Sequence, residues 1–247
     1  MNIDIREKYY KRKKALQDIK LDFPKGQMTL IIGTSGAGKS TLIKCILGQT
    51  EFKGKKGGYS AADIAYIPQF TALNRNETVF SAVYWTERLN SFVLPSPIIA
   101  QNTEAILKRV GIETIRDCKI CNLSGGQKQR VSIAKELIRN KNIIIADEID
   151  TGLDCGTAWC LIKKLKEITV REQKTTIVIS HNLMNMQLYD NVVILAKDNS
   201  NCGRVVYNGK PNNLAGHFGL KSVVDVLISL IPVNEGGLGK AEEYLKR

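Results

Sequence analysis

The sequence predicts one α/β domain that is interrupted by a helical insertion. Short apolar stretches with the length of strands alternate with stretches of helical pattern along most of the chain. Between Gln69 and Ser124, by contrast, no strongly β-like stretch occurs. A chain of 247 residues with 43% hydrophobic content can bury a full core, so we expect residues 1–247 to form a single domain.

The first predicted elements surround a glycine-rich loop. Residues 16–23 alternate apolar and polar side chains, which is the two-residue period of a half-buried strand. After a turn at residues 24–26, residues 28–32 are expected to form a short apolar strand, and residues 33–38 are rich in glycine. Residues 39–47 then have a helical pattern that ends at Gly48. The order strand, loop and helix is therefore expected here.

Later elements complete the predicted domain. Further apolar strands are expected at residues 64–67, 142–146, 175–180 and 191–196. The helical insertion, approximately residues 70–140, is expected to hold helices near residues 77–90 and 103–110, with a proline-containing loop at residues 90–97 between them. A short C-terminal extension is expected over approximately residues 208–247.

The net charge of +12 is concentrated near the N-terminus, where residues 1–60 carry 13 Lys and Arg against 5 Asp and Glu. Four consecutive basic residues, 11–14, could contact nucleic acid, an anionic lipid surface or a polyphosphate. This run has no interleaved aromatic platform beyond Tyr9 and Tyr10. We therefore favour a solvated turn and do not favour nucleic acid as a partner.

The sequence gives no sign of a membrane-spanning or secreted chain. No stretch approaches the roughly 18 to 20 uninterrupted apolar residues that cross a bilayer. The charged N-terminus lacks the apolar segment of a secretory signal, so we expect a cytoplasmic location. The six cysteines are then expected to be reduced, and the CxxC of Cys118 and Cys121 lacks the second pair or nearby histidines of a zinc site.

The glycine-rich loop fits the phosphate-binding pattern GxxxxGK[ST] in the strand-to-helix setting that this pattern requires. Successive backbone N–H groups can face one anion, and the positive end of the following helix adds to the attraction. Lys39 is expected to reach the β- and γ-phosphates of a nucleotide, and the Ser40 hydroxyl to hold Mg²⁺. The predicted phosphate-binding residues are Gly33, Thr34, Ser35, Gly36, Ala37, Gly38, Lys39, Ser40 and Thr41.

Two carboxylates follow the apolar stretch at residues 143–146. Asp147 is placed to bind Mg²⁺ through the coordination shell of the ion. Glu148, one residue further, is placed to orient and polarise an attacking water. Beside a phosphate loop this pair predicts nucleotide hydrolysis. The two motifs together still fit a kinase, a GTPase or a helicase.

A second candidate anion site, LSGGQ at residues 123–127, precedes a helix expected over residues 127–139. The positive end of that helix would face phosphate. With the KQR that follows it, this segment is identified as the signature sequence of the ATP-binding cassette (ABC) family. The resemblance implies an α/β P-loop NTPase fold with a RecA-like core sheet, an antiparallel β subdomain and the helical insertion.

Four further segments resemble motifs of this family. Gln69 resembles the Q-loop glutamine, which contacts the metal and couples to a transport subunit, and His181 resembles the switch histidine that senses the γ-phosphate. DTGLD at residues 150–154 resembles the D-loop, although residues 149–151 are Ile-Asp-Thr where the family usually has Pro-Thr-Ser. Tyr10, at 23 residues before Gly33, has a spacing similar to that of the aromatic residue that stacks on adenine, with Tyr9 as the alternative.

The resemblance implies an ATPase that requires Mg²⁺ and works as a dimer, either with itself or with a close paralogue. Each ATP would lie between the phosphate loop of one chain and the signature residues of the other, which are Ser124, Gly125, Gly126 and Gln127. Within one chain the two anion sites are 86 residues apart, across the insertion. Glu148 would orient the water, and Lys39 and His181 would stabilise the transferred phosphoryl group. The implied metal ligands are Ser40, Gln69 and Asp147.

Two functions fit this resemblance. The first is the ATPase subunit of a transporter, peripheral on the cytoplasmic face of the membrane, which powers a separate membrane-spanning subunit. Residues 193–197, 203–211 and 217–219 are similar to the G-type exporter ATPases, so an exporter is expected. The second is a soluble cassette ATPase that serves cofactor assembly or a nucleic-acid process. The sequence has no second cassette, zinc insertion or long coiled coil, which favours the transporter.

The helical arm after Gln69 would receive the membrane-spanning subunit. Its apolar residues include candidates for the docking surface, although several of them are also candidates for the core of the arm. These candidates are Phe70, Leu73, Val79, Phe80, Val83 and Tyr84.

Overall fold

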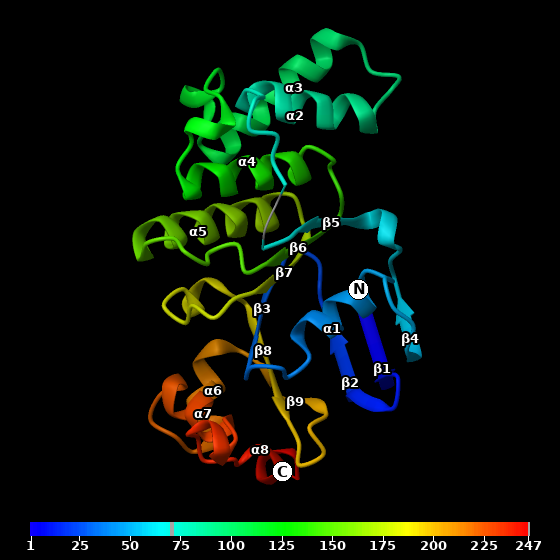
Figure 1. The fold of residues 1–247 in the computed structure, drawn as a ribbon, viewed down its shortest axis with the longest axis vertical. Coiled ribbons are helices and arrows are strands. Elements are labelled where there is room, and N and C mark those ends of the chain that lie inside the picture. Colours follow the sequence, from blue (N-terminus) through cyan, green and yellow to red (C-terminus); the bar gives the residue numbers. More distant parts are fainter. Residues whose placement is uncertain (70–71, 247) are drawn as a thin grey trace.

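The computed structural model describes residues 1–69 and 72–246, and in that part of the chain nine strands form one sheet. Their order across the sheet is β4-β1-β2-β9-β8-β3-β7-β6-β5 (Figure 1). The strands are β1 (Asn2–Tyr10), β2 (Lys13–Asp22), β3 (Met28–Gly33), β4 (Lys53–Gly57), β5 (Ile64–Ile67), β6 (Ile143–Asp147), β7 (Thr175–Ile179), β8 (Asn191–Lys197) and β9 (Gly203–Gly209). Six of them lie at or within two or three residues of predicted strands, and the mixed α/β fold is confirmed.

The strands that position the site are parallel. β8, β3, β7, β6 and β5 pair side by side in one direction. Parallel strands are buried on both faces, which explains why these segments are apolar without alternation. Because the strands are parallel, the loops that follow β3, β5, β6 and β7 all leave from the same edge of the sheet. The candidate site lies along this edge.

The other side of the sheet is mostly antiparallel, and three of its strands were not predicted. β1 pairs with β2 and with β4, and β9 pairs antiparallel with β8. The first two residues of the basic run, Lys11 and Arg12, form the exposed hairpin turn between β1 and β2, and Lys13 and Lys14 begin β2. A turn is thus present here, and that it is only solvated stays a prediction.

Eight α-helices accompany the sheet in the described part of the chain. They are α1 (Lys39–Ile46), α2 (Val79–Asn90), α3 (Ser96–Val110), α4 (Gly125–Leu137), α5 (Cys155–Arg171), α6 (Leu214–Phe218), α7 (Val223–Leu230) and α8 (Ala241–Leu245). The helical arm of α2 and α3 lies at one end of the molecule, and α6 to α8 lie at the other (Figure 1).

The third helix is longer than the sequence pattern predicts. We expected a loop at residues 90–97 because of its two prolines, but α3 already begins at Ser96. Pro97 lies in the first turn, where a backbone N–H has no partner within the helix and its absence is therefore tolerated. The loop is confined to the residues before Ser96.

Alternate residues of the central strands point into two cores. Leu30 and Ile32 of β3 join a cluster with α4, α5 and the helical arm. Ile31 points to the opposite face and joins a cluster with α1, β1 and β2. Within the described residues, no helix has both the length and the apolar character needed to cross a membrane.

Candidate active site

The glycine-rich loop joins β3 to α1 in a conformation that requires glycine. Gly38 has a φ of 94°, and a Cβ there would lie 2.4 Å from Leu16 Cδ2. A Cβ on Gly33 would lie 2.2 Å from the carbonyl oxygen of Leu195. No side chain caps the start of α1, so the first N–H groups of this helix are available to an anion.

Lys39 lies folded over this loop. Its Nζ donates hydrogen bonds to the carbonyl oxygens of Gly33 at 2.9 Å and Thr34 at 3.2 Å. Burial lowers the pKa of Lys39, and the nearby carboxylates of Glu148 and Asp147 oppose this shift. The predicted phosphate-binding lysine and the two predicted acids are therefore close enough to interact electrostatically.

Asp147 is held by a tyrosine that the sequence analysis did not single out. It ends β6, and its Oδ2 accepts a hydrogen bond from the Tyr66 hydroxyl of neighbouring β5 at 3.0 Å. Burial raises the pKa of Asp147, and the bond from Tyr66 opposes the rise. Burial and the nearby Asp147 raise the pKa of Tyr66 to about 12. Only the pairing of β5 with β6 brings these residues together.

Glu148 is the centre of the site. Its carboxylate oxygens face two side chains: Gln69 Nε2 donates to Oε2 at 2.8 Å, and His181 Nε2 lies 3.2 Å from Oε1. The backbone of Glu148 is left-handed, with φ at 49°, and its N–H donates to the Ile179 carbonyl at 2.9 Å. Such a conformation costs a residue with a Cβ about 1 kcal/mol or more, so the surrounding contacts must hold it. The structure thus brings together three residues that the sequence predicted separately.

Asp150 links the segment after Glu148 to the loop that carries His181. It is buried, and its Oδ2 accepts a hydrogen bond from Ser180 Oγ at 2.7 Å. Burial raises the pKa of Asp150, and the bond from Ser180 opposes the rise. Although the sequence analysis placed Asp150 in the D-loop, it offered no partner for it. The neighbour of His181, Ser180, is that partner.

Replacing Ser180 with alanine is expected to destabilise the protein by about 1–3 kcal/mol, because a buried carboxylate loses a hydrogen bond. The pKa of Asp150 would rise further. At a pH where this carboxyl group is protonated in both the folded and the unfolded protein, its raised pKa does not change the free energy of unfolding. As the pH rises towards the folded-state pKa, the raised pKa lowers the free energy of unfolding by an increasing amount. The loss of stability should therefore be larger at pH 7.5 than at pH 4.5, as measured by denaturant unfolding.

Ser229 provides the matched control. It is also buried, but its Oγ donates to the Val226 carbonyl and not to a carboxylate. Ser229→Ala should lower stability by a similar amount at both pH values. Equal losses at both pH values for Ser180→Ala would show that Asp150 is not its energetic partner.

The signature residues lie apart from the phosphate loop of the same chain. Ser124 caps α4, and its Oγ accepts from the Gln127 N–H, while the Gln127 side chain accepts from the Ser124 N–H. Gly125 begins the helix and is exposed. In Figure 1, α4 is well separated from α1, at whose start the phosphate loop lies. The structure does not bring these two predicted anion sites together within one chain.

Tyr10 lies at the end of β1, and its role in stacking stays a prediction. The Nζ atom of Lys8 lies 4.6 Å from the centroid of the Tyr10 ring and donates a hydrogen bond to the Glu51 carbonyl. Tyr10 is 43% exposed, which leaves room for a second planar group. Tyr9 instead lies near Lys14, at 5.6 Å.

Most of the predicted docking residues belong to the core of the arm. Val79 and Val83 are fully buried, and Leu73 and Phe80 pack against the same cluster. Phe70 lies outside the described residues. The exposed apolar side chains of the arm are others: Trp85, Leu89, Phe92, Val93 and Ile98. Sequence reasoning missed them because exposure depends on how α2 and α3 pack together.

The family model described as "ABC transporter" matches residues 16–151. Among curated relatives, the manganese transport system ATP-binding protein MntB of Halalkalibacterium halodurans is 32% identical over 215 residues, which cover 80% of this chain and 83% of that protein. The methionine import ATP-binding protein MetN of Desulfitobacterium hafniense is 36% identical over 184 residues, which cover 68% of this chain. This chain spans 54% of that methionine relative.

A solved structure has the same fold. It is described as a metal-chelate type ABC transporter in an inward-facing conformation, with a TM-score of 0.73 and 22% identity, covering 86% of this chain and 83% of that one. None of these relatives is named as an exporter. They do not support the G-type exporter class that we expected from the C-terminal residues.

Proposed function

Because this chain belongs to the ABC transporter family, we propose that it is the subunit that binds and hydrolyses ATP to power a separate membrane-spanning partner. The observation that carries the proposal is the position of Glu148. Its carboxylate lies between Gln69 and His181 and beside the loop that holds Lys39. A carboxylate in such a place can orient a water against a bound γ-phosphate.

The residues of this chain divide the work of hydrolysis. The N–H groups of the phosphate loop and of the start of α1 bind the phosphates, and Lys39 leaves its two backbone partners to reach the β- and γ-phosphates. Glu148 accepts a hydrogen bond from the water and takes its proton. His181, 3.2 Å from Glu148, donates to the γ-phosphate and stabilises its developing charge.

The residues proposed to hold Mg²⁺ all offer oxygen atoms, which are the ligands that this ion prefers. Ser40 offers a hydroxyl from the first turn of α1, Asp147 offers a carboxylate, and Gln69 offers its amide oxygen, because its nitrogen already donates to Glu148. Burial makes the charged form of Asp147 costly, and a cation would offset that cost. Mg²⁺ bound here would neutralise charge on the phosphates.

The second half of the site comes from another ABC domain in this proposal. Ser124 still has a hydroxyl hydrogen to donate, and the first N–H groups of α4, which include those of Gly125 and Gly126, have no partner within the helix. These donors are separated from the phosphate loop of their own chain (Figure 1). A head-to-tail dimer would bring them to the γ-phosphate of an ATP bound by the partner.

We infer uptake, not export, as the direction of transport. The names of the relatives carry this inference, since the two proteins serve methionine import and a manganese transport system. It is tested by uptake of radiolabelled manganese and methionine into cells with and without the gene. Loss of accumulation of a solute on deletion supports import, and increased retention of it would contradict import.

The exposed apolar side chains of the arm are proposed to receive the membrane-spanning subunit. Trp85 and Leu89 lie one helical turn apart on α2 and are 55% and 65% exposed. Aromatic side chains at the centre of an interface commonly contribute about 2 kcal/mol or more. Trp85→Glu is therefore expected to lower recovery of a multi-span protein by tenfold or more when the chain is purified from gently solubilised membranes.

Leu238→Glu is the control for this experiment. Leu238 is also exposed, at 57%, but it lies between α7 and α8, at the end of the molecule opposite the arm (Figure 1). This variant should keep the partner, and both variants should keep ATP binding. Recovery of soluble partners alone by the unmodified chain would favour the soluble assembly ATPase instead.

A further inference from the structure

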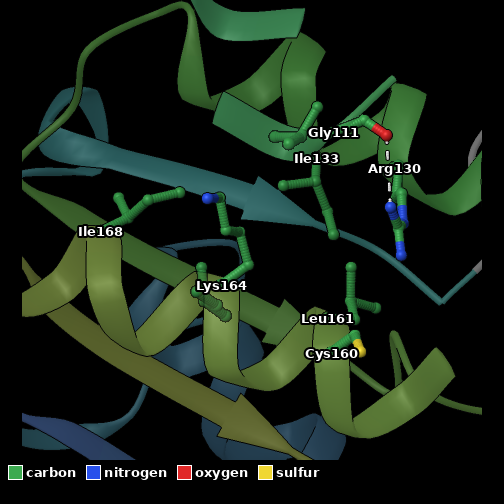
Figure 2. A pocket seen from close by; sticks show the side chains of 9 residues that line it. Gly111, Arg130, Ile133, Cys160, Leu161, Lys164 and Ile168 are labelled. Carbon is green, nitrogen blue, oxygen red and sulfur yellow. Dashed lines mark hydrogen bonds between the residues drawn. The ribbon is translucent and has the colours of Figure 1, made fainter. Parts of the chain in front are cut away.

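A groove with an apolar floor lies between three helices, away from the site described above (Figure 2). It has a volume of about 300 Å³ and is bounded by the end of α3, by α4 and by α5. Its floor consists of aliphatic side chains from all three helices, namely Val110, Ile133, Leu161, Leu165 and Ile168. Such a surface favours an apolar chain over water.

The rim of the groove is cationic and contains no acidic residue. Arg130 makes one hydrogen bond, from Nη1 to the Gly111 carbonyl at 3.3 Å, and no ion pair within the described residues (Figure 2). Lys164, the other cation, lies 3.4 Å from Glu167 one turn further along α5. Arg130 is therefore the cation whose charge is not already matched, and a guanidinium has five N–H donors for an anion.

We propose that this groove binds an amphiphilic monocarboxylate, with its chain on the aliphatic floor and its carboxylate on Arg130. A volume of about 300 Å³ lies at the lower end of the range for small-ligand sites. Decanoate, a saturated monocarboxylate of ten carbons, is the probe. The methylene stem of Lys164, which extends along the groove towards Ile168 in Figure 2, would cover the chain.

The groove lies where a bound ligand could change the rate of ATP turnover by the proposed ATPase. α4 begins at the signature residue Ser124, and α5 begins directly after the D-loop. A ligand in contact with both helices would hold the arm against the core and oppose any rotation between them. Decanoate is therefore expected to slow ATP turnover. This consequence rests on the proposed function, whereas binding itself does not.

Isothermal titration calorimetry of the full chain tests the binding. Decanoate, kept below its micelle concentration, should bind saturably, and decanol should bind about tenfold or more weakly, because it lacks the charge that Arg130 recognises. Arg130→Gln should remove this preference. Arg139→Gln, which replaces an exposed arginine just beyond α4, should retain it. Equal binding of acid and alcohol by the unmodified chain would overturn the proposal.

A second pair of variants tests the location. Cys160 is exposed at the edge of the groove next to Leu161 (Figure 2). Cys155 is exposed at the start of the same helix and does not line the groove. Cys160→Trp should lower decanoate affinity by tenfold or more by filling the groove, and Cys155→Trp should not. Unchanged affinity in Cys160→Trp would place the ligand elsewhere and overturn the proposal.

Turnover measurements separate this proposal from the proposed function. If the unmodified chain hydrolyses ATP and decanoate slows it in the unmodified chain but not in Cys160→Trp, the coupling is supported. If decanoate binds in the groove without changing turnover, the coupling is overturned. If the chain with its partner shows no ATP turnover at all, the proposed function fails, and the calorimetric result on the groove still stands.

Discussion

Glu148→Gln is expected to lower the rate of ATP hydrolysis by about 100-fold or more, because the amide cannot take a proton from the attacking water. ATP binding should persist. The amide has nearly the same shape as the carboxylate, and Lys39 and the phosphate loop are unchanged. Phosphate release at saturating Mg-ATP measures the first effect, and the affinity for a fluorescent ATP analogue measures the second.

The same variant tests the composite site. If the signature residues of a partner complete each ATP site, a chain that binds ATP without hydrolysing it should stay dimeric. Size-exclusion chromatography with light scattering, with and without ATP, gives the mass. A monomer at saturating ATP would contradict the head-to-tail dimer. Glu136→Gln is the control, since Glu136 lies near the end of α4 and pairs with Arg139 just beyond it; it should hydrolyse ATP normally.

Lys39→Ala is expected to weaken ATP binding by about 10- to 100-fold, which corresponds to the loss of one charged hydrogen-bonding group worth about 1.5–3 kcal/mol. Turnover should fall with it. Lys39 is the half-buried ammonium that donates to the carbonyl oxygens of the phosphate loop. The affinity for the ATP analogue and the rate of phosphate release are the measurements.

Lys44 provides the comparison for Lys39. It lies on the same helix, α1, but is exposed to solvent. Lys44→Ala should bind and hydrolyse ATP like the unmodified chain. If Lys39→Ala also did so, while melting at the same temperature, the phosphate site would be misplaced.

Elements with a strong local pattern were predicted well from the sequence. Residues 64–67 were predicted as a strand and form β5 without a shift, because three of its four side chains are buried although the strand pairs with β6 alone at the edge of the sheet. β4 could not be predicted in this way. Its sequence, KGKKG, has no apolar alternation, and it is a strand because its backbone pairs with the edge of β1. A strand that forms through backbone pairing with a distant segment need not show a strand pattern in its own residues.

The sequence by itself determined the phosphate loop and the signature segment, because each is a contiguous run whose glycines and helix start create an anion site locally. Only the tertiary structure decided what surrounds Glu148. Gln69 and His181 follow different strands, β5 and β7, and meet Glu148 because these strands lie parallel on either side of β6. Tyr66 and Ser180 entered the site in the same way. The physical reason is that burial of both faces of the sheet selects the order of its parallel strands. That order places the carboxyl ends of strands that are distant in the sequence at one edge of the sheet.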